Sequence, residues 1–438
     1  MFPQYCQNII KLYNSISIEN TDEEFMKELF NDYVKSMTTY IMFQIKAAAN
    51  KLRPELEAKN RSPIFLSMGA PTANPPKYML DKLKEALDMP GMHLYSTPRG
   101  EKFFLEAVAK RMKIRFGVDL DPNTEISSLL GSKEGLAHII RILLEPTHDE
   151  EEQEVIFVPD PGYASYNQMV QISGGKCFPI PLTEENNYMP DLNKVWKDYL
   201  EQGGKPEKVK ALIINYPNNP LGVTATREYY SHVLNFCKEH KILLISDAAY
   251  SDLYFNEDEK PFSILEFEGA KDIAVEFFSF SKPYAMTGAR MGWICGNAEA
   301  ISQLLVLKST IDNGFYKALQ YACAEILNSK EGEEYYLEAN KELKRKQNIF
   351  VQGMKELGWP EFLVPSATFY LWMPIPPRYS CSKEFTDELL KTSGIVAVPG
   401  HAYGNHGEGY FRVSIVCSEE QIVECINRMK EDGFYYNK

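Results

Sequence analysis

The feature that most constrains the fold is an alternation of short apolar runs with helical stretches between Glu154 and Trp293. The apolar runs are EVIFVPD, KALIINYP, KILLISDAAY, AVEFFSFSK and MGWICG. Runs of this length, separated by helical patterns, are typical of buried strands in a mainly parallel sheet covered by helices on both faces. We therefore predict an α/β fold built on such a sheet.

Four of these runs end in polar or turn-forming residues. In chain order these are Asp160 and Tyr163, residues 215–219, Asp247 and Tyr250, and residues 279–282. A single polar strand end is most simply a solvated loop. Open α/β sheets, however, bind ligands beyond the carboxyl ends of their strands, so four polar ends at one edge predict a ligand site.

The two ends of the chain differ from this central pattern. Before it, a capping box at Thr21 and Glu24 precedes apolar residues at helical spacing, Phe25, Leu29 and Tyr33. A further helical pattern runs from about Tyr40 to Leu56. After it, charged helical patterns over about 300–358 lead to the runs TFYLWMPIP, GIVAVPG and FRVSIV, and Ser418 with Gln421 caps a final helix.

These patterns, in a chain of 438 residues, predict more than one lobe. We expect a helical extension over residues 1–38 and a large ligand-binding lobe over residues 80–312. A smaller α+β lobe is expected from residues 39–79 together with residues 313–438.

Composition excludes several classes of partner. A net charge of −13 leaves no broad basic surface for nucleic acid or an anionic membrane. No apolar run reaches the roughly 20 residues that span a bilayer, and no signal-peptide pattern is present. The eight cysteines include no close Cys/His cluster, so no metal site is predicted and the thiols are expected to be reduced, as in a cytoplasmic protein.

The segment SFSKPYAMTGAR, residues 279–290, carries the most reactive candidate. A partly deprotonated lysine forms an imine with an aldehyde cofactor, while hydroxyls and a guanidinium hold a phosphate dianion. This assigns Lys282 as a nucleophile, with Ser279, Ser281 and Arg290 as anchors. The alternative is that Lys282 is a surface lysine and Arg290 an ordinary ion-pair partner.

Asp247 supplies a second indication in the segment LISDAAY. A buried carboxylate is costly unless it is paired with a cation, and a protonated pyridine nitrogen is such a partner. Tyr250 would then hydrogen-bond a ring oxygen. The alternative is that Asp247 caps a following helix.

Three other motifs offer groups to the same cofactor. Asn219 in NYPNNPLG has an amide for the ring oxygen and for a substrate carboxylate, although Asn-Pro pairs also simply form turns. The helix start at Ser132 and Lys133 exposes backbone amides to a phosphate, unless Ser132 is only an N-cap. Tyr163 would stack on a planar ring, unless it is ordinary packing.

In this order along the chain, the motifs resemble the class I/II aminotransferases of pyridoxal phosphate fold type I, over roughly residues 40–430. The resemblance implies a mainly parallel seven-stranded sheet and pyridoxal 5′-phosphate as cofactor. It makes Lys282 the Schiff-base and proton-transfer residue, Asp247 the pyridinium partner, and Asn219 and Tyr250 the ring-oxygen contacts.

The resemblance also extends to phosphate, partner and substrate. It implies a phosphate cup formed by the amides of Ser132 and Lys133 with Ser279, Ser281 and Arg290, and a stacking ring in Tyr163. Tyr95 and Asn313 would reach across a homodimer interface. Arg412 of GYFRVSIV would hold the substrate α-carboxylate, with a backbone donor from Gly69. For Arg412 the alternative is a surface ion pair.

The segments IDNGFYKALQ and HGEGYFRVSIV are most similar to the LL-diaminopimelate aminotransferases, enzymes of lysine biosynthesis, and to related aspartate and alanine enzymes. The substrates implied are LL-diaminopimelate and 2-oxoglutarate. The chain has Pro98 and Arg99 where one branch of those enzymes carries an acidic residue. A pyridoxal phosphate lyase or aminocyclopropane carboxylate synthase would keep the same cofactor residues, whereas a non-enzymatic scaffold predicts that at least one is missing.

Overall fold

The computed structural model describes residues 29–37 and 41–437, in two units that divide after Thr39. The described part of the first unit contains helix α3, Asp32–Ser36. Its N-cap is Asn31, whose side chain accepts a hydrogen bond from the Tyr33 amide. The predicted capping box at Thr21 and Glu24 lies outside the described residues, as does Phe25.

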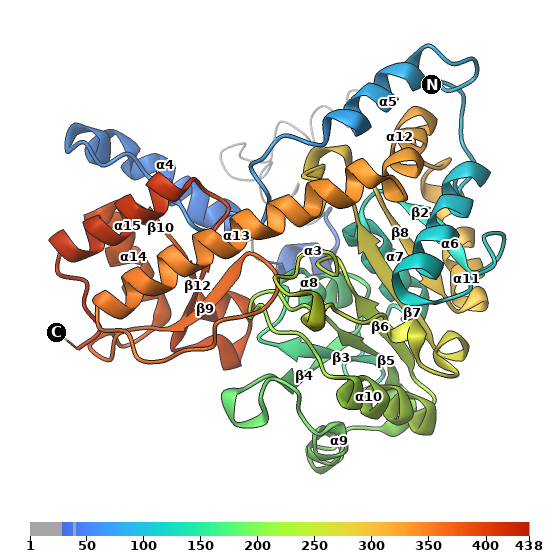
Figure 1. The fold of residues 1–438 in the computed structure, drawn as a ribbon. Helices are drawn as coiled ribbons and strands as arrows, with labels where there is room; N and C mark the ends of the chain where they lie inside the picture. Colours follow the sequence, from blue (N-terminus) through green and yellow to red (C-terminus); the bar gives the residue numbers. More distant parts are fainter. Residues whose placement is uncertain (1–28, 38–40, 438) are drawn as a thin grey trace, which may run out of the picture. The chain divides into compact units, whose positions relative to one another are not determined.

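The second unit is built on a seven-stranded sheet with the order β2-β8-β7-β6-β5-β3-β4 (Figure 1). The strands are β2 Ile126–Leu129, β3 Val155–Asp160, β4 Lys176–Pro181, β5 Val209–Ile214, β6 Leu243–Asp247, β7 Ala274–Ser279 and β8 Gly292–Gly296. Only β8 is antiparallel to its neighbours, β7 and β2. The mainly parallel seven-stranded sheet is therefore confirmed.

Helices cover both faces of this sheet (Figure 1). Helices α7 Ser132–Leu143, α8 Ser165–Ile172 and α11 Ala298–Ile311 pack on one face, and α6 Lys102–Phe116, α9 Leu192–Glu201 and α10 Arg227–His240 on the other. Side chains alternate along each strand. In β3, Ile156 and Val158 join the core under α7 and α8, whereas Val155 and Phe157 join the opposite core.

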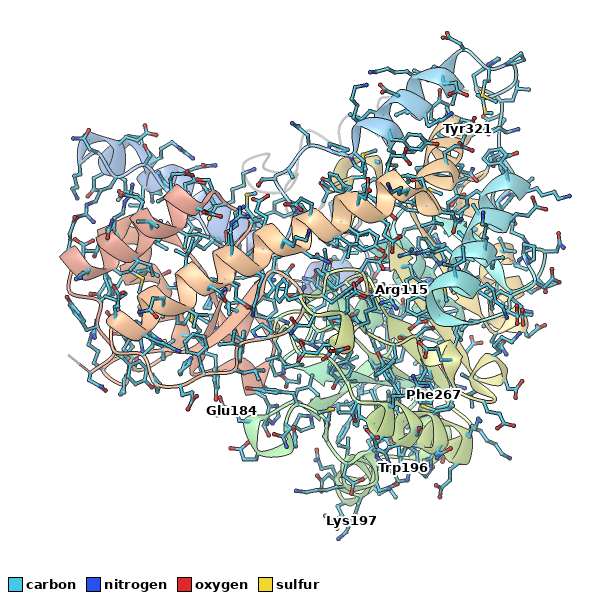
Figure 2. The ribbon with its side chains drawn as sticks, viewed as in Figure 1. Arg115, Glu184, Trp196, Lys197, Phe267 and Tyr321 are labelled. Carbon is cyan, nitrogen blue, oxygen red and sulfur yellow. The ribbon has the colours of Figure 1, made fainter. Side chains whose placement is uncertain are left out.

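Aromatic side chains fill the core beneath α9 and α10. Trp196 is labelled on α9 in Figure 2. Its ring centroid lies 5.9 Å from that of Phe157 and 5.8 Å from that of Phe236. At the other end of the sheet, α5 Lys77–Leu87 and α12 Lys317–Leu327 pack together and α12 also contacts α6, where Tyr321 meets Phe103 edge-on. Large rings thus anchor helices from distant parts of the chain.

A second hydrophobic core lies around a three-stranded antiparallel sheet with the order β11-β12-β9. Its strands are β9 Tyr370–Pro374, β11 Val398–Pro399 and β12 Tyr410–Ser414, covered by α13 Lys330–Glu356, α14 Ser382–Ser393 and α15 Glu419–Glu431. The capping box of Ser418 and Gln421 opens α15 as predicted. Helix α4, Ile41–Ala58, leads to β1, Ile64–Phe65, which pairs in parallel with β10, Ile395–Val396.

Core membership bears on the predicted lobes. Residues of α12 belong to the first core, although they follow the predicted boundary at residue 312. The second core contains most of the buried side chains from Phe350 onward, but Trp372, Val398 and Tyr403 belong to the first core. The boundaries 39–79 with 313–438, and 80–312, remain predictions.

Among residues 29–37 and 41–437 no helix is long and apolar enough to cross a membrane, and no group of three acidic, histidine or cysteine side chains is placed to bind a metal.

Candidate active site

A cavity of about 720 Å³ opens at the carboxyl ends of β5, β6 and β7. Its lining includes twelve of the predicted site residues: Gly69, Ser132, Lys133, Tyr163, Asn219, Asp247, Tyr250, Ser279, Ser281, Lys282, Arg290 and Arg412. The sheet edge supplies most of them because parallel strands end on the same side. The predicted ligand site is therefore one continuous cavity.

Lys282 follows β7 and reaches into this cavity. Its Nζ donates a hydrogen bond to the Gly69 carbonyl and lies 5.7 Å from the centre of the Tyr250 ring. Burial lowers the pKa of the Lys282 amine to about 8, and the charges of Arg412 and Arg290 act in the same direction. A nucleophilic neutral amine is thus available near neutral pH, and the alternative of a surface lysine is wrong.

Asp247 ends β6 and is 5% exposed. Its Oδ2 accepts a hydrogen bond of 2.6 Å from the Tyr166 hydroxyl, and its Oδ1 accepts one from the Ala249 amide. Burial raises the pKa of Asp247, while the Tyr166 and Ala249 hydrogen bonds and the charge of Lys282 oppose the rise. A turn follows the strand, so the alternative of a helix-capping aspartate is wrong.

The loop after β5 is held by its own amides. Asn215 Nδ2 donates to the Asp247 carbonyl at 2.7 Å, and Asn215 Oδ1 accepts from the Asn219 amide at 2.8 Å. This places the Asn219 side chain beside Arg412, whose Nη1 donates to Asn219 Oδ1 at 2.7 Å. One asparagine therefore holds the backbone of both Asp247 and Asn219.

An anion-binding cup is formed where α7 begins. Gly131 is the N-cap, with φ of +81°, so the alternative that Ser132 is the N-cap is wrong. A Cβ on Gly131 would lie 2.6 Å from Arg290 Nη2, which shows how closely the guanidinium approaches the helix start. The backbone amides of the first helical turn and a guanidinium together favour an anion such as phosphate.

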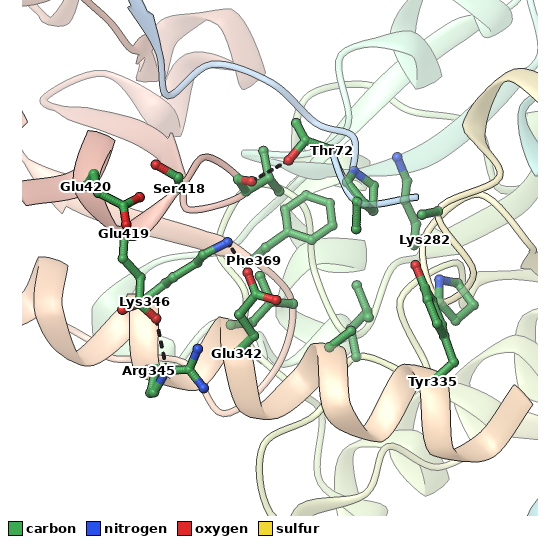
Figure 3. Close-up of a pocket in the computed structure, with 18 residues that line it drawn as sticks. Thr72, Lys282, Tyr335, Glu342, Arg345, Lys346, Phe369, Ser418, Glu419 and Glu420 are labelled. Carbon is green, nitrogen blue, oxygen red and sulfur yellow. Dashed lines mark hydrogen bonds and ion pairs between the residues drawn. The ribbon is translucent and has the colours of Figure 1, made fainter. Parts of the chain in front are cut away.

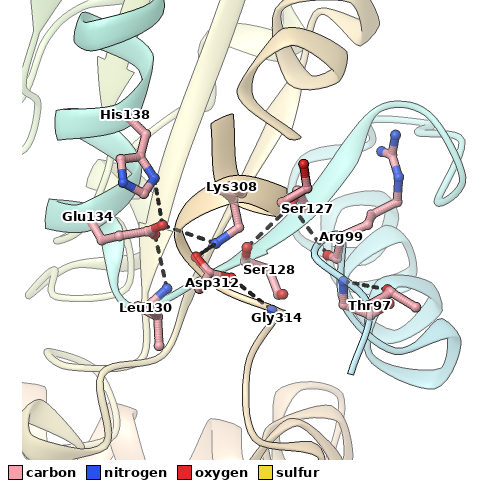
Figure 4. Close-up of polar contacts among 12 residues, drawn as sticks. Thr97, Arg99, Ser127, Ser128, Leu130, Glu134, His138, Lys308, Asp312 and Gly314 are labelled. Atoms are coloured by element: carbon pink, nitrogen blue, oxygen red, sulfur yellow. Dashed lines mark hydrogen bonds and ion pairs between the residues drawn. The ribbon is translucent and has the colours of Figure 1, made fainter. Parts of the chain in front are cut away.

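Buried charges behind the cup fix the start of α7 (Figure 4). Glu134 Oε2 accepts from the Leu130 amide at 3.1 Å, and Glu134 Oε1 lies 3.0 Å from Lys308 Nζ on α11. Lys308 also contacts Asp312, whose Oδ1 accepts from the Gly314 amide. Burial raises the pKa of Glu134, but the contacts with His138 and Lys308 lower it overall. The carboxylate is therefore ionised beside the buried lysine.

Arg412 lies on β12 and is 3% exposed. Besides Asn219 it contacts the Ser67 carbonyl through Nη2 at 2.9 Å, and its guanidinium lies 4.2 Å from the centre of the Tyr370 ring. The alternative of a surface ion pair is wrong, because the side chain is buried and faces the cavity. A planar guanidinium in this position suits a carboxylate.

Gly69 and two tyrosines close one wall. The Tyr250 hydroxyl is 2.9 Å from that of Tyr370, and a Cβ on Gly69 would lie 2.9 Å from the Tyr370 hydroxyl. Glycine thus leaves room for this tyrosine pair. The contact formed by Gly69 uses its carbonyl as an acceptor, while the predicted role of its amide as a donor remains a prediction.

Two predicted residues lie outside the cavity. Tyr95 is 84% exposed and Asn313 is also exposed. Neither is among the residues that line the cavity within the described chain. Their predicted role across a dimer interface remains a prediction.

Several residues in the cavity wall or directly behind it have no counterpart in the predicted site. Tyr166 binds Asp247, Tyr370 binds Tyr250, and Tyr403 stacks near Arg412. Helix α4 adds a row of side chains: Met42, Phe43, Lys46, Asn50 and Arg53. Tyr166 lies three residues after Tyr163, and Tyr370 lies in the apolar run TFYLWMPIP, but neither pattern indicated a site role. Helical spacing was the only signal for the α4 row.

The family model of the aminotransferases of class I and II matches residues 61–429. The chain belongs to this family. The match spans both hydrophobic cores and every element that lines the cavity except α4. The fold class and the enzyme class inferred from the sequence are thereby confirmed.

Relatives of this aminotransferase cover most of the chain. It is 40% identical to LL-diaminopimelate aminotransferase 2 of Trichormus variabilis, over 89% of the chain and 96% of that relative. It is 38% identical to LL-diaminopimelate aminotransferase of Moorella thermoacetica, over 84% of the chain and 90% of the relative. Among solved structures, apo-BacF from Bacillus subtilis has a TM-score of 0.86 at 32% identity, covering 94% of this chain and 100% of that one.

Proposed function

We propose that this aminotransferase uses pyridoxal phosphate to move an amino group between LL-diaminopimelate and 2-oxoglutarate. One observation supports pyridoxal phosphate as the cofactor: the Lys282 amine, with a pKa of about 8, lies in the same cavity as the buried carboxylate of Asp247. The substrate proposal is supported by relatives that are named LL-diaminopimelate aminotransferases and match over most of their length.

The donor set of the cavity fits this cofactor. The Gly131 cradle, with Arg290 and the first amides of α7, would hold the phosphate together with Ser279 and Ser281. Asp247 would pair with the protonated ring nitrogen, which would supply the cation that a buried carboxylate requires. Asn219 and Tyr250 would contact the ring oxygen, and Tyr163 would stack on the ring.

When bound, pyridoxal phosphate supplies an aldehyde carbon that reacts with amines and a ring that draws electrons from the substrate Cα. Arg412 holds the α-carboxylate in a bidentate contact, and Asn219 fixes the orientation of the guanidinium. The surroundings of the Lys282 amine keep it partly neutral, so it can accept the proton from the Cα of the amino acid in one half-reaction. In the other half-reaction the same amine returns a proton to Cα of the new amino acid. Asp247, held by Tyr166 and the Ala249 amide, would face the ring nitrogen and favour its protonated form.

The loop after Tyr95 bears on how a second ammonium group would bind. The Arg99 guanidinium donates to the carbonyls of Thr124 and Ile126 in its own chain, so it is held against the β2 segment. We propose that Tyr95 and Asn313, both exposed, complete the cavity of a partner subunit in a homodimer. That arrangement would leave Arg99 outside the substrate contacts.

A donor screen tests the proposal. The purified enzyme with pyridoxal phosphate is supplied with 2-oxoglutarate and, in turn, LL-diaminopimelate, aspartate, alanine or ornithine, and glutamate formation is measured. We expect kcat/KM to be highest for LL-diaminopimelate. Higher values for aspartate or alanine would contradict the substrate proposal. Continuous ammonia release without any 2-oxo acid would instead identify a lyase.

A further inference from the structure

We propose that helix α4 forms a binding site for the second carboxylate of a dicarboxylic substrate, through Lys46, Asn50 and Arg53. This inference rests on the proposed function, because it requires that the amino acid binds in the cavity beside Arg412. It extends that function by naming the substrate class that the far end of the cavity selects.

One face of α4 is turned toward the cavity. The lining residues Met42, Phe43, Lys46, Asn50 and Arg53 recur at the spacing of a single helical face. The residues of α4 that are buried, Ala49 and Leu56, lie on an adjacent face and pack against Leu390 and Val396. The buried face therefore fixes the rotation of the helix, and that rotation turns Lys46 and Arg53 to the site.

The cavity lining carries a large excess of positive charge. It includes six cationic side chains and one carboxylate, namely Lys46, Arg53, Lys133, Lys282, Arg290 and Arg412 against Asp247. The phosphate would neutralise about two of these charges and the α-carboxylate one more. Asp247 is matched by the ring nitrogen, and Lys282 is neutral when it acts as a base. About two positive charges then remain, and Lys46 and Arg53 contribute to them.

A neighbouring cavity shows that this excess is particular to the site. That cavity, of about 500 Å³, shares Lys282 as a wall and lies along α13 (Figure 3). Its charged lining is balanced, with Lys282, Arg345 and Lys346 against Glu342, Glu419 and Glu420. Lys346 pairs with Glu342, and Arg345 Nε lies 2.9 Å from Glu419 Oε1. Only the larger cavity is therefore suited to several anionic groups at once.

The two α4 cations are available to a ligand. Arg53 Nη1 lies 3.3 Å from Glu57 Oε1, in a pair whose side chains are 40% and 47% exposed. An exposed pair of this kind contributes little free energy, so a carboxylate in the cavity competes readily for the guanidinium. Asn50, between the two cations on the same face, adds an amide donor.

One site of this kind serves both half-reactions. LL-diaminopimelate and 2-oxoglutarate differ in length, yet each has a second carboxylate. Lys46 and Arg53 are seven residues apart, about 10 Å along a helix, so they present cations at two positions along the cavity wall for carboxylates of substrates that differ in length. A substrate with a neutral side chain would leave both cations without a bound anion.

The test compares glutamate with its amide. The cofactor-loaded enzyme is mixed with glutamate or glutamine alone, and the single conversion to the pyridoxamine form is followed by absorbance to obtain the second-order rate constants. We expect the wild type to prefer glutamate by tenfold or more, and Lys46→Gln/Arg53→Gln to reduce this ratio by about tenfold. Lys51→Gln, an equal loss of charge on α4 outside the cavity, should leave the ratio unchanged.

The outcomes separate the two proposals. If neither glutamate nor any other amino acid converts the wild-type enzyme to the pyridoxamine form, the proposed function fails. If it converts but treats glutamate and glutamine alike, or if the double variant keeps the wild-type ratio, the α4 site alone is overturned. Lys46→Arg keeps the positive charge, so it should retain the wild-type ratio. Circular dichroism checks that each variant is folded.

Discussion

The Tyr166 hydroxyl is the only side-chain donor to Asp247 among the described residues. Because that hydrogen bond lowers the pKa of a carboxyl that burial raises, Tyr166→Phe should raise the pKa of Asp247 further. Protonation of Asp247 removes the charge that the ring nitrogen needs. We expect kcat to fall about tenfold, and the acid limb of the kcat profile to move to higher pH.

Steady-state rates between pH 5 and 9 check this prediction. Tyr199→Phe is a matched control, because the Tyr199 hydroxyl donates to the Lys205 carbonyl outside the cavity. Its pH profile should coincide with that of the wild type. An unshifted acid limb in Tyr166→Phe would show that this tyrosine has only a packing role.

Lys282 gives a second prediction. With a pKa of about 8, the neutral amine rises roughly tenfold per pH unit below that value and levels off above it. The rate at which the cofactor-free enzyme captures pyridoxal phosphate should follow the same curve between pH 6 and 9.5. A midpoint near pH 10.5, the ordinary lysine value, would contradict the assigned surroundings.

Lys282→Ala should lower turnover by about a thousandfold or more, because both the reactive amine and the proton carrier are lost. The circular dichroism spectrum should match that of the wild type, because the Lys282 side chain lines the cavity and is not part of either hydrophobic core. Added ethylamine, which replaces the missing amine, should restore part of the activity. Turnover like that of the wild type would refute the assignment of Lys282.

The residues that carry reactive groups could be predicted, whereas those that position them could not. Lys282, Asp247 and Arg412 stand in ordered motifs with few chemical alternatives. Tyr370 is only one aromatic residue in an apolar strand, and its meeting with Tyr250 depends on how the second core packs on the sheet. Contacts between residues 120 positions apart depend on tertiary packing, which local patterns do not specify.

Helices α7 and α11 are joined by the buried contacts of Lys308, Glu134 and Asp312, with side chains 2%, 16% and 14% exposed. Lys308→Met should lower the free energy of unfolding by about 3 kcal/mol, because two carboxylates are left without their cation. It should also weaken cofactor binding, since Glu134 holds the Leu130 amide beside the cup.

Urea denaturation and a pyridoxal phosphate titration measure the two effects. Lys308→Met/Glu134→Gln, which also removes one of the stranded charges, should recover part of the stability. Lys271→Met provides a control, because Lys271 pairs with Glu125 at the surface and should change stability by less than about 1 kcal/mol. Equal losses in Lys308→Met and Lys271→Met would contradict the role of burial.

Strands β3, β5, β6, β7 and β8 followed from apolar runs in the sequence, and four of these runs have polar ends, but β2 and β4 were not among the runs. The antiparallel direction of β8 could not be predicted, because the apolar pattern of MGWICG does not specify the direction of a strand. Strand β1, with only two residues, and the packing of α12 on the first core depend on distant partners, Ile395 and α5. Local patterns therefore predicted elements better than they predicted neighbours.

A homodimer with shared sites predicts complementation between inactive chains. Tyr95→Ala and Lys282→Ala variants, each inactive alone, would form hybrid dimers in which one site carries both changes and the other carries none. Random mixing after reversible dissociation should restore about a quarter of the wild-type activity, because half of the dimers are hybrids and half of their sites are intact.

Arg412→Ala mixed with Lys282→Ala is the matched control, since both side chains line the cavity of one chain. Each site of that hybrid lacks one residue, so no activity should return. Recovery in this control, or none with Tyr95→Ala, would contradict the proposed sharing. Sedimentation of the mixed samples confirms that dimers have formed.

The reactive groups and the α4 cations differ in how they are built into the molecule. Asp247 and Arg412 lie on buried strands and Lys282 directly follows one, whereas Lys46 is an exposed side chain and Arg53 a partly exposed one on helix α4. Exchanging exposed helical residues usually changes stability by less than about 0.5 kcal/mol. Substitutions on α4 can therefore redirect this scaffold to new amino acids, by mutation or by design, while the bond-breaking chemistry remains intact.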